Sequence, residues 1–226
     1  MKKKAKKEVK IEEVLEEPEE QPWHVGPLKI IIGLFLALII IMMAVPYYGV
    51  QLDPEPKKMI TISELSVGEL QTSNKTYSFS ELYKIVKPED VQTKRVANLI
   101  ASYGCDDSRV CQAKAIYYFV RDNINYVRDP FNTEYIEDPK EVLKSEGADC
   151  ESGSILLATL EEAIGIDSQL VLIEGHAYLR IKLHEAINRH KQEEDWVYLD
   201  WTCDTCSFGE VPWQDLKPER VNYLDV

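Results

Sequence analysis

Residues 147–158 read Gly147-Ala-Asp-Cys150-Glu-Ser-Gly-Ser-Ile-Leu-Leu-Ala158, which places a cysteine at the start of an apolar helix. Asp149 is a suitable N-cap, and the small residues after Cys150 leave room for a substrate beside the sulfur. The run from Ile155 onward predicts a buried helix that ends before Gly165. A helix N-terminus favours thiolate over thiol, so we expect a lowered pKa for Cys150. A buried structural cysteine is the alternative interpretation.

Two segments after this helix alternate polar and apolar residues, as strands with one buried face do. Their polar faces carry His176, Tyr178 and Arg180 in the first segment, and Trp196, Tyr198 and Asp200 in the second. We expect the two segments to pair antiparallel with His176 opposite Asp200. The same register pairs Tyr178 with Tyr198 and Arg180 with Trp196. It predicts that His176 and Asp200 lie side by side while both apolar faces enter the core.

Cys150, His176 and Asp200 are the residue types of a nucleophilic site. A thiol needs a base to take its proton, and the base needs a carboxylate that holds it in one tautomer. A histidine in a strand is more often structural than catalytic. The shared face of His176 and Asp200 favours the catalytic interpretation.

These segments resemble the motifs of the transglutaminase-like superfamily of papain-type thiol enzymes, over roughly residues 110–202. The resemblance rests on the cysteine motif Gly147-Ala-Asp-Cys150-Glu-Ser, the histidine motif Gly175-His176-Ala-Tyr, the aspartate motif Trp196-Val-Tyr-Leu-Asp200 and the lead-in Ile116–Tyr126. It implies a member of prokaryotic type, and the N-terminal apolar segment considered below would make this member membrane-anchored. In that family Cys150 would be the nucleophile, His176 the general base and then acid, and Asp200 the orienting carboxylate.

The sequence departs from the family pattern at two places. Trp201 follows Asp200, where many members have proline. Animal-type transglutaminases also use an upstream tryptophan to hold the oxyanion, but no tryptophan lies between Trp23 and Trp196. The oxyanion must then rest on the Cys150 backbone N–H and on a second donor that the sequence leaves unidentified. This departure weakens transglutaminase activity more than it weakens thiol hydrolysis.

Four further cysteines, Cys105, Cys111, Cys203 and Cys206, form two closely spaced pairs. In an oxidising compartment they would make two local disulfides, or cross-paired disulfides that tie the helices to the strand carrying Asp200. Two thiolate pairs could instead hold a structural zinc ion. Unpaired thiols are the remaining alternative. Apart from this zinc, we expect no cofactor.

The N-terminal region predicts a membrane anchor. The net charge of −13 argues against a nucleic-acid-binding surface, which needs a basic stripe. We expect a charged tail over residues 1–27, a transmembrane helix over 28–48, a stalk over 49–75 and the thiol-enzyme domain over 76–226. A cleaved signal peptide is the rival interpretation of the apolar segment. The lysines near the N-terminus favour a domain outside the cytoplasm.

Helical patterns precede the strand patterns, so the expected fold class is α+β. Its core would be a papain-like helix bearing Cys150, packed on an antiparallel sheet bearing His176 and Asp200. The connection over residues 184–195 is polar, and we expect both of its histidines, His184 and His190, to be solvated.

The function that these features predict is cleavage of a peptide or amide bond in a protein or peptide substrate, through an acyl-enzyme. A lysine acceptor in place of water would give cross-linking, and the sequence favours hydrolysis only through the missing tryptophan. A non-catalytic binding or scaffold module at the membrane is the alternative from another class. A zinc-stabilised envelope protein is a third.

Overall fold

The structure is a computed structural model, and it describes residues 26–49, 53–65, 70–72, 75, 77–78, 81, 85–130, 135–212 and 219–226. The chain separates into two compact units, residues 1–51 and 52–226. Apart from its last two residues, the predicted charged tail over 1–27 lies outside the described residues.

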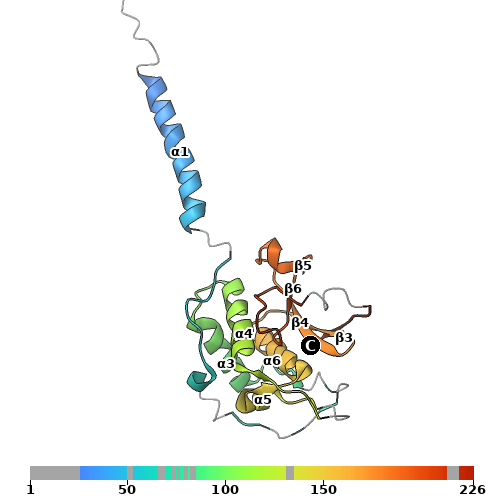
Figure 1. The fold of residues 1–226 in the computed structure, drawn as a ribbon. Helices are drawn as coiled ribbons and strands as arrows, with labels where there is room; N and C mark the ends of the chain where they lie inside the picture. Colours follow the sequence, from blue (N-terminus) through green and yellow to red (C-terminus); the bar gives the residue numbers. More distant parts are fainter. Residues whose placement is uncertain are drawn as a thin grey trace, which may run out of the picture. The chain divides into compact units, whose positions relative to one another are not determined.

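The described part of the first unit is essentially one helix, α1 (Pro27–Gly49), drawn in blue in Figure 1. Its window Pro27–Val45 has a mean hydropathy of 2.9, and none of that window is buried. A core helix of a soluble domain would be mostly buried. The predicted apolar helix is therefore present, with the length and composition of a membrane span or of a signal sequence.

Within its described residues, the second unit has a 3-10 turn and four α-helices before the main sheet. These are η2 (Ile62–Leu65), α3 (Val91–Tyr103), α4 (Arg109–Asn123), α5 (Pro139–Ser145) and α6 (Cys150–Ala163). Each α-helix begins after a side-chain cap, supplied by Asp90, Ser108, Asp138 and Asp149 in turn. Local sequence signals thus define where the helices begin, including the one that starts at Cys150.

A five-stranded antiparallel sheet follows, in the order β5-β6-β4-β3-β7. Its strands are β3 (Ser168–Ile173), β4 (His176–Lys182), β5 (Lys191–Glu193), β6 (Trp196–Leu199) and β7 (Asn222–Asp225). The 3-10 turn η5 (Asn188–His190) precedes β5. Two short strands, β1 (Asn125–Tyr126) and β2 (Gly147–Ala148), form a separate parallel pair. The predicted α+β class is confirmed (Figure 1).

The predicted strand register is wrong by two residues. β4 and β6 do pair antiparallel, but Leu179 lies opposite Leu199 and Arg180 opposite Tyr198. Side chains alternate with a period of two, so a shift of two residues keeps every side chain on its predicted face. His176 and Asp200 are consequently diagonal neighbours on one face rather than a directly opposed pair.

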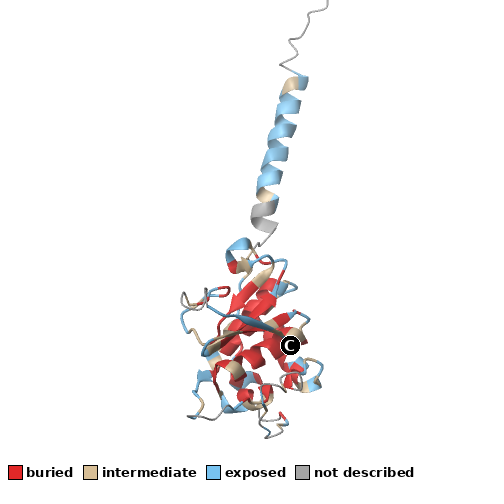
Figure 2. Cartoon of the chain, turned by 90° about the vertical axis from the view of Figure 1, so that its right-hand side faces the viewer, coloured by how far each residue is buried: buried red, intermediate tan, exposed pale blue. Residues whose placement is uncertain are grey.

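Helix α6 lies at the centre of the core, between the sheet and helices α3 and α4 (Figures 1 and 2). The apolar faces of the two central strands are buried as predicted, through Ala177, Leu179, Ile181, Val197, Leu199 and Trp201. Trp201 packs directly on Gly153, where an added Cβ atom would come within 2.1 Å of the indole ring. The missing side chain at Gly153 therefore allows α6 to approach this tryptophan.

The segment that precedes α3 contributes to the same core. Ile60, Ile62 and Leu65 are buried. The fully buried Lys114 on α4 binds Asp53 (2.6 Å) and Glu55 (2.5 Å). The predicted division between a stalk over 49–75 and a domain over 76–226 stays a prediction, while residues 53–65 already contact the domain.

The two histidines of the 184–195 connection differ. His184 is exposed and lies 2.5 Å from Asp195, so the expectation of a solvated side chain is confirmed for it. For His190 the expectation is wrong, because this side chain is buried against Phe208 and lies 3.0 Å from Asp53 Oδ1. The contact with Asp53 spans 137 residues of sequence, so no local pattern could have indicated it.

Candidate active site

Cys150 is the first residue of α6, as the sequence predicts. Asp149 caps the helix by accepting a hydrogen bond from Ser152 N at 2.8 Å. The Cys150 side chain is buried, and its thiol donates to Glu151 Oε2 at 2.8 Å. Burial, followed by the hydrogen bond to Glu151 and its charge, raises the pKa of Cys150 to about 12. The expected lowering by the helix N-terminus is thus outweighed in this arrangement.

His176 and Asp200 form a hydrogen-bonded pair. His176 Nε2 lies 3.0 Å from Asp200 Oδ2, and the Asp200 side chain is fully buried. The other carboxylate oxygen, Oδ1, accepts from Thr202 N (3.0 Å) and Thr202 Oγ1 (2.7 Å). The carboxylate therefore has a fixed orientation toward the imidazole ring.

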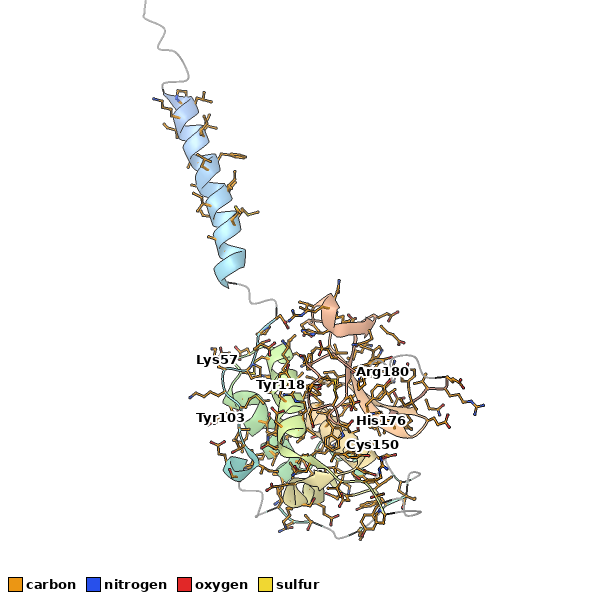
Figure 3. The ribbon with its side chains drawn as sticks, in the orientation of Figure 1. Lys57, Tyr103, Tyr118, Cys150, His176 and Arg180 are labelled. Atoms are coloured by element: carbon orange, nitrogen blue, oxygen red, sulfur yellow. A yellow bond between two sulfur atoms is a disulfide. The ribbon has the colours of Figure 1, made fainter. Side chains whose placement is uncertain are left out.

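The beginning of α6 faces the beginning of β4. Ser154 Oγ donates to the carbonyl of Ala177 at 3.2 Å, and the Ala177 N–H lies near enough to the Cys150 sulfur to favour its thiolate. Figure 3 shows Cys150 and His176 at this junction. Of the three predicted residues, the structure joins His176 to Asp200 and places Cys150 beside them, with its thiol hydrogen on Glu151. A direct contact between Cys150 and His176 stays a prediction.

Open space flanks the site on several sides. A cleft of about 760 Å³ is lined by Arg121, Asp122, Ile124, Asn125, Tyr126, His176, Thr202 and Asp204. A second cavity of about 450 Å³ shares His176 and Thr202 and adds Asp200. A third, of about 420 Å³, includes Ala148 and Asp149, the residues just before Cys150. These cavities thus adjoin His176, Asp200 and the residues just before Cys150.

The third cavity carries negative charge near the cysteine. Burial raises the pKa values of Asp129, Glu137 and Asp149, and neighbouring carboxylates raise each of them further. Among the described residues, however, no group of three or more His, Cys, Asp or Glu side chains is arranged to hold a metal ion.

All five cysteines fall within the described residues, and four of them are oxidised in pairs. Cys105 is bonded to Cys111, and Cys203 to Cys206. The prediction of two local disulfides is confirmed, while cross-pairing and unpaired thiols are wrong. The zinc alternative for Cys105, Cys111, Cys203 and Cys206 is also wrong, because a sulfur in a disulfide has no thiolate to give a metal. Cys150 is the free cysteine.

Sequence reasoning missed three residues that support the site. Thr202 fixes Asp200 Oδ1, Tyr117 OH donates to the Asp200 carbonyl at 3.2 Å, and Trp201 Nε1 donates to the Cys150 carbonyl at 3.4 Å. Of these three, only Thr202 could have been predicted from the local sequence, because an aspartate side chain often accepts a hydrogen bond from the backbone N–H two residues later. The contacts of Tyr117 and Trp201 are long-range.

The chain was compared with known families, curated proteins and solved structures. The family that matches residues 96–201 is described as the transglutaminase-like superfamily. The matched part of the chain includes Cys150, His176 and Asp200, and it is similar to this superfamily. A solved structure that matches is Legionella pneumophila LapG, with 18% identity and a TM-score of 0.40, covering 68% of this chain and 78% of that one. No curated protein matches the chain.

Proposed function

We propose that this protein is a thiol hydrolase that cleaves peptide or amide bonds through an acyl-enzyme on Cys150. The observation that carries the proposal is the His176–Asp200 pair, with Nε2 3.0 Å from Oδ2, beside the helix start that holds the free cysteine. These are the base, the orienting carboxylate and the nucleophile that acyl transfer requires.

In the proposed reaction His176 takes the proton from Cys150. Because Nε2 is bonded to Asp200, Nδ1 is the ring nitrogen directed to this task. The thiolate then attacks the substrate carbonyl, the S–C bond forms, and the carbonyl electron pair moves to oxygen. The backbone N–H of Cys150 belongs to the first turn of α6, whose amides have no partner within the helix, so it would bind this oxyanion.

The imidazolium then protonates the leaving amine as the C–N bond breaks. Water, deprotonated by His176, attacks the thioester and releases the acid and the free thiol. An amine acceptor at this step would give cross-linking instead. We favour hydrolysis because the upstream tryptophan of animal-type transglutaminases is absent and the cleft beside His176 has a volume of about 760 Å³ open to water.

A non-catalytic binding module is the second candidate, and one observation favours it. The Cys150 thiol is bonded to Glu151, and its pKa is raised to about 12, so the nucleophile is neutral in this arrangement. For catalysis, the thiol must leave Glu151 and engage His176.

We also propose that α1 is a retained membrane anchor and that the domain lies outside the cytoplasm. The apolar composition of α1 supports the anchor. The two disulfides support an oxidising compartment. Carbonate washing of membranes tests the anchor, since the full-length chain should stay with the lipid and a shortened chain in the soluble fraction would indicate a cleaved signal.

The test of the catalytic proposal is labelling by a thiol-directed acyl probe, a peptide-derived thioester for example. The wild-type chain should be acylated at Cys150, Cys150→Ala should not be labelled, and His176→Ala should be labelled far more slowly. A wild-type chain that is folded but not acylated would support the binding module. Far-UV and near-UV circular dichroism of each variant provides the folding control.

A further inference from the structure

The cleft beside His176 contains several hydrogen-bond donors, and most of them have partners. Asn125 Nδ2 donates to the Glu146 carbonyl at 3.0 Å. Thr202 Oγ1 donates to Asp200 Oδ1 at 2.7 Å. The Arg121 guanidinium is held by Asp122 (2.7 Å) and by the Cys206 carbonyl (2.7 Å). Among the described residues that line this cleft, the Tyr126 hydroxyl is therefore the neutral donor best placed to serve a substrate.

The tryptophan nearest the nucleophile cannot take this role. Trp201 is 1% exposed, and its indole N–H donates to the Cys150 carbonyl at 3.4 Å. It also lies against Gly153 on the buried side of α6. Trp201 thus packs against the buried side of α6 and does not reach the cleft.

Strand pairing and ring packing hold Tyr126 near Cys150. In the parallel β1–β2 pair it lies opposite Ala148, two residues before Cys150. The next residue extends this pairing, because Val127 N donates to the Ala148 carbonyl at 2.8 Å. Its ring centroid is 6.3 Å from that of Trp201, which itself touches Cys150. At the same time Tyr126 is 49% exposed, so a substrate can approach its hydroxyl.

The surroundings of the Tyr126 hydroxyl suit a donor. Burial, and after it the negative charge of a Cys150 thiolate, raises the pKa of Tyr126, whereas a hydrogen bond from Arg128 lowers it. An arginine has donors only, so the phenol oxygen accepts from Arg128 and its own hydrogen remains for another group. The tyrosine stays protonated while the thiolate forms beside it.

We propose that Tyr126 is a catalytic residue that donates a hydrogen bond to the oxyanion of the tetrahedral intermediate, together with the Cys150 backbone N–H. The inference rests on the proposed function and supplies the second donor that hydrolysis requires. As the S–C bond forms, the carbonyl electron pair moves to oxygen, and the phenol O–H binds that oxygen without losing its proton. When the intermediate collapses, the electron pair returns and the C–N bond breaks.

The test compares two reactions of the same thiol in Tyr126→Phe. Acylation by a p-nitrophenyl ester passes through an oxyanion, whereas alkylation by iodoacetamide does not. Acylation should slow by about 10²–10³-fold, the effect of removing one oxyanion donor in other enzymes, while alkylation stays within about twofold. The conservative variant Tyr126→Trp, which keeps a donor at the ring edge, should recover part of the acylation rate.

Tyr103→Phe is the matched control, because Tyr103 is an exposed tyrosine on α3 whose hydroxyl interacts only weakly with Glu64, at 3.4 Å. It should leave both rates unchanged. Unchanged acylation in Tyr126→Phe would overturn the oxyanion role, and so would an equal fall in both rates, which indicates a structural role. Failure of the proposed function appears separately, as a wild-type chain that is alkylated but never acylated.

Discussion

The candidate site has one half on the sheet, His176 and Asp200, and one half on α6, Cys150. The two halves differ in whether their hydrogen bonds match those of the proposed mechanism. On the sheet, both carboxylate oxygens of Asp200 have partners, His176 on one side and Thr202 on the other. On α6, the Cys150 thiol hydrogen is held by Glu151, and the neutral thiol is favoured. In the proposed mechanism, the sheet therefore organises the acid–base pair in advance, while the proposed nucleophile Cys150 needs one change of side-chain contact. Single substitutions in each half of the site can test this difference.

Among the variants that test this comparison, Asp200→Asn should have the largest effect. The amide cannot stabilise an imidazolium and favours the wrong tautomer of His176, a change that costs about 10⁴-fold in serine proteases. A cysteine–histidine ion pair tolerates this loss better, so we expect a fall of roughly 10²-fold or more in the acylation rate. Asp195→Asn, in the turn between β5 and β6, is the control and should have no effect. Full activity in Asp200→Asn would remove this aspartate from the mechanism.

Glu151→Gln tests the α6 half of the site, and this substitution should increase the reactivity of the Cys150 thiol. The Glu151 carboxylate accepts the thiol hydrogen and repels the thiolate, and both effects raise the pKa of Cys150. A neutral amide should lower that pKa and speed iodoacetamide alkylation at pH 8 by roughly tenfold, since one pKa unit is a tenfold change in thiolate. The pH profile of alkylation should move to lower pH, whereas Glu151→Asp should lie between the two. An unchanged pH profile would show that Glu151 does not influence the pKa of Cys150.

The two disulfides offer a smaller, matched comparison. Cys203–Cys206 lies in the loop after Asp200, and the Cys206 carbonyl accepts hydrogen bonds from Tyr117 and Arg121. Cys105–Cys111 joins the loop after α3 to α4, and neither of its cysteines lines the cleft. Replacing either pair by serine should reduce the free energy of unfolding by about 2 kcal/mol, as expected for loops this short. Only the Cys203/Cys206 variant should also lower the acylation rate by several-fold. Equal acylation rates in the two variants would show that the loop after Asp200 does not influence the site.

The smallest effect concerns Glu161, a buried residue on α6 that takes no part in the proposed mechanism. Both of its carboxylate oxygens lack a hydrogen-bond partner, and burial raises its pKa well above the usual value. Because the pKa of Glu161 is higher in the folded than in the unfolded state, the folded protein binds more protons. The contribution of Glu161 to the free energy of unfolding therefore decreases as pH rises above the unfolded pKa of about 4.5. Glu161→Leu should increase the free energy of unfolding at pH 8 by about 1–2 kcal/mol and less at pH 5. Urea unfolding at the two pH values measures this difference.

Local signals predicted most of the fold and the composition of the candidate site. The cap at Asp149 defined the start of α6, and alternation placed His176 and Asp200 on one face. The register of β4 and β6 was wrong by two residues because both registers bury the same apolar face. The Cys150 pKa direction was wrong because the sequence gives no measure of burial or of where the Glu151 side chain points. His190 was misplaced because its partner, Asp53, is distant in sequence.

The contact between Gly153 and Trp201 has a consequence for how this chain and its relatives can vary. An added methyl group at position 153 would collide with the indole ring, so these two positions cannot change independently. Relatives with a small residue or proline in place of Trp201 should accept alanine or serine in place of Gly153, whereas those with tryptophan should retain glycine. Covariation of these two positions across the superfamily would record how closely the helix that begins at Cys150 approaches the end of the sheet.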